Sequence, residues 1–88
     1  MVINTTKIRK SKLSETISIE LPRGSRILSV GWDDNLFEKG VVIRYHCPDN
    51  LASLHTTKLK IIQEGRHYHI CDIGAYIGQA GEYHVFYA

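Results

Sequence analysis

The last fifteen residues limit how this chain can fold more than any other segment does. Residues 74–88, GAYIGQAGEYHVFYA, contain two short runs rich in aromatic and β-branched residues that flank glycines. This pattern is typical of two antiparallel strands joined by a tight turn. The second run carries bulky side chains on both faces, with Tyr83, Val85 and Tyr87 on one and His84 and Phe86 on the other. The segment therefore predicts a closing hairpin whose last strand is either central in a sheet or covered by a second subunit.

Five further segments have the composition of strands. They are residues 2–8, 15–21, 25–32, 41–46 and 57–64. Apolar and polar residues alternate in most of them, and a period of two is typical of a half-buried strand. Residues 51–55 are too few for a stable helix, so they fit a single helical turn or an irregular loop.

The alternation also predicts which side chains face the core. The expected inward residues are Leu28, Val30 and Trp32 in one strand, Val41, Ile43 and Tyr45 in the next, and Leu59 and Ile61 in a third. Arg44, His46 and the lysines of residues 57–64 are expected to face outward. Trp32 fits the core by its spacing, although the acidic run after it would also suit a contact residue at the rim of a sheet.

Turn signals recur every ~8–12 residues between these segments, which predicts an all-β fold. We expect a small antiparallel β-sandwich or partly open barrel of five to seven strands, with at most one short helical turn. Residues 1–88 are long enough for one compact β domain and too few for a second core. No apolar run approaches the ~18–20 residues of a membrane helix, so we predict no membrane contact and a cytoplasmic location.

The histidine-rich segment near residue 68 is a candidate metal site. If it is extended, His67, His69 and Cys71 lie on one face, and all three are zinc ligands by type. Their spacing differs from that of zinc ribbons and fingers, so surface histidines beside a buried cysteine are the favoured interpretation. The sequence also has no Gly-x-Ser-x-Gly elbow and no glycine-rich phosphate loop before a helix. We therefore predict no cofactor and no enzymatic activity.

Basic residues cluster near the N-terminus, at Lys7, Arg9, Lys10 and Lys12. Such a cluster could hold phosphate, as in a nucleic-acid-binding module, but more often it is a solvated edge. The sequence pI of about 8.6 lies below the value of ~9 that a dedicated nucleic-acid-binding domain usually exceeds. A nucleic-acid interface is therefore the less favoured interpretation.

The candidate binding residues come from the expected outer face of a strand, from the histidine-rich segment and from the only tryptophan. Arg44 and His46 on a rigid strand could hold an anionic ligand or an acidic protein patch, although ordinary solvent-facing polarity is the favoured interpretation. The full set is Trp32, Arg44, His46, Arg66, His67, Tyr68 and His69.

Two motifs in this chain resemble those of a known group of proteins. Residues 21–30, LPRGSRILSV, resemble an ELPxGAxILSV element, and residues 74–86 resemble a GxYIGT…HVF ending. Together they are similar to a family of small, mostly uncharacterised proteins encoded by bacteriophages and prophages. The resemblance covers roughly a third of the chain, and residues 41–45 and 65–69 depart from it. It implies a phage origin and a compact β fold, and it implies no catalytic residues.

Small phage proteins often act by binding host machinery, so the favoured function is interference with a host protein in the host cytoplasm. A component of host defence against phages is the expected target, bound by a patch around residues 33–40 and 65–73. The alternative is an oligomer that sequesters a nucleotide signal in a pocket between subunits, lined by Arg44, Arg66, His67 and Tyr68. A nucleic-acid-binding module that uses residues 7–12 is a third, less favoured function.

Overall fold

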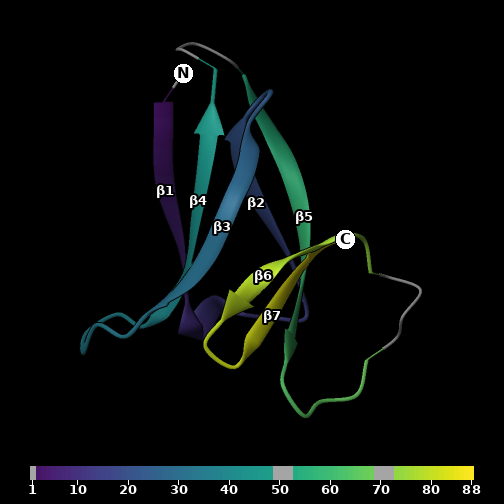
Figure 1. Cartoon of the computed structure of the whole chain (residues 1–88). Helices are drawn as coiled ribbons and strands as arrows, with labels where there is room; N and C mark the ends of the chain where they lie inside the picture. Colours follow the sequence, from purple (N-terminus) through teal and green to yellow (C-terminus); the bar gives the residue numbers. More distant parts are fainter. Residues whose placement is uncertain (1, 49–52, 69–72) are drawn as a thin grey trace.

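The computed structural model describes residues 2–48, 53–68 and 73–88, and strands make up most of them (Figure 1). The strands are β1 (Val2–Arg9), β2 (Thr16–Pro22), β3 (Arg26–Asp33), β4 (Gly40–Cys47), β5 (Leu54–Gln63), β6 (Tyr76–Ala80) and β7 (Tyr83–Tyr87). One 3-10 turn, η1 (Lys10–Lys12), joins β1 to β2. In these residues no helix has the length and apolar character needed to span a membrane. The predicted all-β fold with at most one short helical turn is confirmed.

The strands form two antiparallel sheets, with the orders β1-β4-β3 and β2-β5-β7-β6. Their inner faces share one core, to which both sheets contribute buried side chains: Ile8, Val41, Ile43, Leu59, Ile61, Ala80 and Val85. β6 lies beside β3, because a Cβ added to Gly78 would come within 2.9 Å of Val30 Cγ2. No ladder joins these two strands in the described residues, so the sheets do not close into a barrel.

The C-terminal hairpin supplies one inner strand and one edge strand of the larger sheet. β7 lies between β5 and β6, and Val85 on its inner face is fully buried. Gly81 makes the β6–β7 turn with a φ of 60° and packs against the Trp32 ring. The main chain stays paired to its last residue, since the Ala88 N–H donates to the Lys58 carbonyl at 3.1 Å. Of the two roles predicted for this strand, the central one is therefore correct.

One predicted face is wrong at Leu28. A β-bulge between Ile27 and Ser29 shifts the register of β3 against β4. Because a bulge adds one residue, it reverses the alternation on one side of itself. Ile27 consequently packs against the core, and Leu28 is 47% exposed. Trp32 follows the bulge and packs against the core, as its spacing predicted.

β5 also differs from its prediction in two respects. It begins at Leu54, so Leu54 and His55 continue a strand, while residues 51 and 52 lie outside the described residues. Lys60 lies on the outer face as predicted, since it pairs with Thr16 and Phe86, but it is only 6% exposed. The side chain is covered because β5 is an inner strand with β2 and β7 on either side, and its Nζ lies 3.3 Å from Glu15 Oε1.

Ile43 is expected to be a main support of the shared core. Ile43→Ala should lower the free energy of unfolding by about 2–5 kcal/mol, because it leaves a cavity under a fully buried side chain. The matched control is Ile3→Ala in the neighbouring strand β1, where the side chain is 66% exposed and the loss should stay within about 0.5 kcal/mol. Urea unfolding measures both. Equal losses would contradict the core described above.

Candidate functional site

The loop between β3 and β4, residues 34–39, carries the most exposed apolar side chains of the described chain. Leu36 is 89% exposed and Phe37 is 97% exposed. The loop projects from the body of the protein at the lower left of Figure 1. Two adjacent side chains of this size are normally buried in a folded domain, so their exposure indicates a contact surface.

Short-range hydrogen bonds fix the shape of this loop. The Asn35 N–H donates to Asp33 Oδ1 at 3.0 Å, and the Phe37 N–H donates to Asn35 Oδ1 at 2.9 Å. The Glu38 N–H then donates to the Asn35 carbonyl at 3.1 Å. Asp and Asn side chains favour such turns because they bond the backbone two residues further on. The spacing of Asp33, Asn35 and Phe37 thus holds the exposed pair in one conformation.

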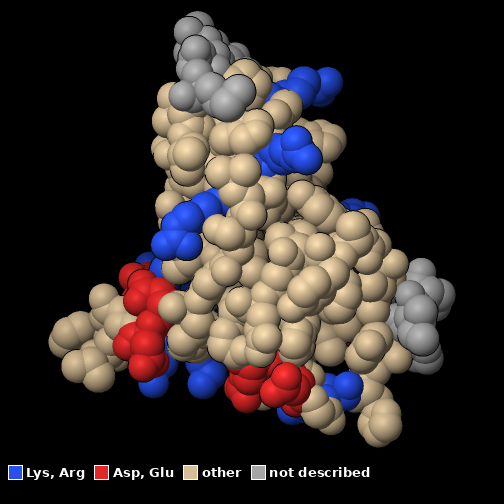
Figure 2. All heavy atoms as spheres, viewed as in Figure 1, with Lys and Arg blue, Asp and Glu red and all other residues tan. Residues whose placement is uncertain are grey.

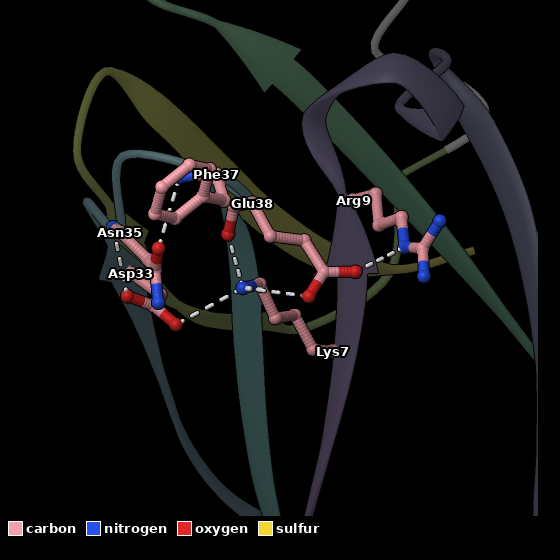
Figure 3. A network of polar contacts seen from close by, with 6 residues as sticks. All are labelled: Lys7, Arg9, Asp33, Asn35, Phe37 and Glu38. Atoms are coloured by element: carbon pink, nitrogen blue, oxygen red, sulfur yellow. Dashed lines mark hydrogen bonds and ion pairs between the residues drawn. The ribbon is translucent and has the colours of Figure 1, made fainter.

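Lys7 of β1 ties both ends of the loop to the sheet (Figure 3). Its Nζ donates to Asp33 Oδ2 at 3.0 Å and to the Glu38 main-chain carbonyl, and it lies 4.0 Å from Glu38 Oε2. Arg9 pairs with the same Glu38 carboxylate through its Nε. The exposed ends of these carboxylates are screened by water, but Lys7 itself is mostly buried. The loop is therefore anchored to a strand that is remote in sequence.

This network holds the pKa of Asp33 below its ordinary value of 3.8. The largest cause is the hydrogen bond from Lys7, followed by the bond from the Asn35 N–H, and partial burial opposes both. Because the pKa is lowered, the stabilising contribution is present above the unfolded value and is lost as the pH falls through the folded value. The contacts of the Asp33 carboxylate with Lys7 and with the Asn35 N–H are therefore formed at neutral pH.

These contacts involve only two of the four residues in the basic cluster near the N-terminus. Lys7 and Arg9 are paired with Asp33 and Glu38, whereas Lys10 and Lys12 have no ion-pair partner in the described part of the chain. Two of the four cations are thus neutralised locally. The cluster offers less free positive charge for phosphate than its sequence suggests.

Arg44 and His46 lie on β4 as predicted, on the face turned away from the core. Arg44 is exposed and extends over Gly31 of β3, and His46 is half-buried. His46 Nδ1 is buried with no hydrogen-bond partner among the described groups. Over the upper part of the molecule, Figure 2 shows basic side chains with no acidic ones among them, while the acidic side chains gather at the lower end. Trp32 lies on the opposite, inner face of its sheet, where its ring stacks on Tyr83 at 5.6 Å.

A pocket of about 390 Å³ brings together three of the predicted binding residues. It is lined by Lys10, Leu13, Ser14, Glu15, Ile61, Ile62, Gln63, Arg66, His67, Tyr68 and Tyr83. Arg66, His67 and Tyr68 were predicted, and His69 lies outside the described residues. Arg44, which was expected beside them in a pocket between subunits, does not line this pocket within one chain and lies on the outer face of β4. Lys10 and Tyr83 were missed as pocket residues because only the fold brings them beside Arg66.

The suggested zinc site at His67, His69 and Cys71 falls largely on residues 69–72, outside the described residues. Among the residues that are described, no three His, Cys, Asp or Glu side chains are grouped to hold a metal ion. Cys47 is a buried free thiol at the end of β4.

Comparisons of this chain with protein-family models, with curated proteins and with solved structures find no match. The resemblance to small phage proteins therefore stays a prediction. A β-sandwich by itself does not specify a function, so the β3–β4 loop and the pocket are the features that bear on it.

Lys7→Met tests whether Lys7 holds the loop network. The substitution should raise the pKa of Asp33 towards 3.8, because the largest cause of its lowering is removed while the Asn35 N–H still donates. A carbon-13 NMR titration of the Asp33 carboxyl group measures this pKa. Lys12→Met, which removes a cation that makes no contact with Asp33, should leave it unchanged. An unaltered pKa in Lys7→Met would show that the ion pair does not form in solution.

Proposed function

We propose that this chain is a binding protein that holds a partner protein through Leu36 and Phe37 on the β3–β4 loop. The observation that supports this most is the near-complete exposure of both side chains on a loop whose backbone is fixed. A large apolar anchor surrounded by polar residues is the usual arrangement of an interface hot spot.

The free-energy balance favours such a contact. Burying a Leu or Phe side chain contributes roughly 1.5–3 kcal/mol. A flexible loop would lose much of this gain, because ordering side chains and backbone at an interface costs free energy. Here Asn35 and Lys7 already order the loop in the free protein. Most of the contact energy therefore remains available for binding.

The charges beside the anchor favour a protein over a membrane as the partner. Interfacial membrane anchors combine apolar residues with Lys and Arg that meet anionic lipids. Asp34 is instead highly exposed next to Leu36, with Lys39 Nζ 3.5 Å from its carboxylate. Together with Asp33 and Glu38 it forms a group of three carboxylates at the base of the loop, which Lys7, Arg9 and Lys39 balance. The loop therefore carries no excess of positive charge towards a lipid surface, and the partner is expected to present an apolar pocket for Phe37 with a polar rim.

The resemblance to phage proteins supports a bacterial host protein as this partner. A small protein that occupies an apolar pocket on a larger one blocks whatever else binds there. Interference with a host-defence component in the host cytoplasm is the setting proposed for it. The phage origin and the identity of the target rest on the resemblance, whereas the contact residues rest on the loop geometry.

Phe37→Ser tests the proposed contact. Wild-type protein immobilised through its N-terminus should retain a host protein from bacterial lysate, and Phe37→Ser should lose it. Leu54→Ser is the matched control, since it removes an exposed apolar side chain from β5, away from the loop. With the purified partner, Phe37→Ala should weaken binding by about 2 kcal/mol or more, roughly 30-fold, as measured by calorimetry.

Three results would contradict the proposal. The retained protein could bind Phe37→Ser as well as it binds the wild type. Anionic vesicles could bind the wild type and lose it on the same substitution, which would make the loop a membrane anchor. Light scattering could show dimers that Phe37→Ser dissolves, which would make the loop a contact between copies of the chain.

A further inference from the structure

The pocket described above shares none of its lining residues with the β3–β4 loop, although the Lys10 N–H donates to the Lys39 carbonyl at the end of that loop. Its lining comes from the connection between β1 and β2, from the end of β5 and the residues after it, and from Tyr83 of β7. A volume of about 390 Å³ falls within the range of roughly 300–1,000 Å³ typical of small-molecule sites. The protein contact proposed for Leu36 and Phe37 does not involve this pocket.

The inner part of the pocket is apolar and held in place by the core. Ile61 and Ile62 are buried, and Leu13 packs against the core cluster. Tyr83 is fixed by Trp32, whose ring stacks on it at an angle of 24°. A ligand would therefore meet a preformed surface that includes the side of an aromatic ring.

The polar lining carries two cations, Lys10 and Arg66, and one carboxylate, Glu15. Neither Lys10 nor Arg66 forms an ion pair in the described part of the chain, whereas Glu15 lies 3.3 Å from Lys60. The two other nearby carboxylates contact groups other than these cations: Glu64 lies 3.2 Å from His84, and Glu82 accepts from the Gln63 amide at 3.0 Å. An anionic group in the pocket would be the natural partner of the two cations.

We propose that this pocket binds a mononucleotide. Lys10 and Arg66 would hold the phosphate, and the base would lie against the rings of Tyr68 and Tyr83. Tyr68 is partly exposed at the pocket, so its ring is available for stacking, which every base can use. Gln63 donates through its amide nitrogen to Glu82, which leaves its Oε1 to accept from the edge of a base.

The phosphate and the base of a mononucleotide each match a different part of the pocket lining. An inorganic anion alone would not use the apolar floor and the two tyrosines. An uncharged aromatic molecule would leave Lys10 and Arg66 without partners. The site lies within one chain, so it needs no second subunit, in contrast to a pocket that would include Arg44. The proposal is also independent of the partner protein proposed for Phe37.

The experiment follows Trp32 fluorescence while the four ribonucleoside monophosphates are added to the full chain. Trp32 is the only tryptophan in the sequence and contacts Tyr83 in the pocket lining, so it reports a ligand bound there. At least one nucleotide should give a saturable change, which calorimetry should reproduce. The double substitution Lys10→Gln/Arg66→Gln should weaken that binding at least tenfold, because charge-assisted hydrogen bonds are lost.

Lys12→Gln/Arg23→Gln is the matched control, since it removes the same charge from exposed residues that do not line the pocket. It should bind like the wild type. Lys10→Arg should also keep its affinity, and circular dichroism should show all variants folded. The corresponding nucleoside and inorganic phosphate, each added alone, should bind at least tenfold more weakly than the nucleotide.

The proposal fails if none of the four nucleotides gives saturable binding. It also fails if the control variant loses as much affinity as the pocket variant, which would indicate attraction to net charge only. A nucleoside that binds as tightly as its nucleotide would remove the role of Lys10 and Arg66. Phe37→Ser should bind the nucleotide normally, so this proposal and the protein contact can fail separately.

Discussion

The structure depends on the packing of β4 against β5 and β7 across a single thin core. Val41 and Ile43 from one sheet and Leu59 and Val85 from the other are the large side chains that lose all contact with solvent. Each of these three strands is an inner strand of its sheet, so backbone pairing and side-chain burial act on the same residues. The loops and turns that connect the inner strands do not contribute to this pairing and burial. Both the β3–β4 loop and the pocket lie where such strands begin or end.

Periodicity was enough to predict most of the fold because each strand buries one face. The strand positions, the inward placement of Val41 and Ile43 on β4 and the closing hairpin all follow from residue types that alternate or cluster locally. At Leu28 and Lys60 the alternation does not predict the solvent exposure of the side chain. A bulge at Leu28 changes the phase without any local signal such as glycine or proline. Lys60 is covered by neighbouring strands, and sequence spacing contains no information about which strand lies beside which.

The candidate sites were only partly visible in the sequence for related reasons. Arg66, His67 and Tyr68 stood out by residue type, but Lys10 and Tyr83 join them only through the fold. Residues 33–40 were predicted to be part of a contact patch, but Leu36 and Phe37 were not singled out within it, because large apolar residues are usually buried. Their exposure could have been suspected from Asp33 and Asn35, whose spacing suits consecutive side-chain-capped turns.

Lys7 gives the β3–β4 loop a property that its own residues could not provide. β1 is an edge strand, paired only with β4 in the described residues, and edge strands detach more readily than inner ones. When β1 detaches, the Lys7 ammonium group leaves Asp33 and Glu38, and the loop loses the contacts that hold its two ends. Ordering of the loop and attachment of the N-terminal strand are therefore thermodynamically linked, so that each favours the other.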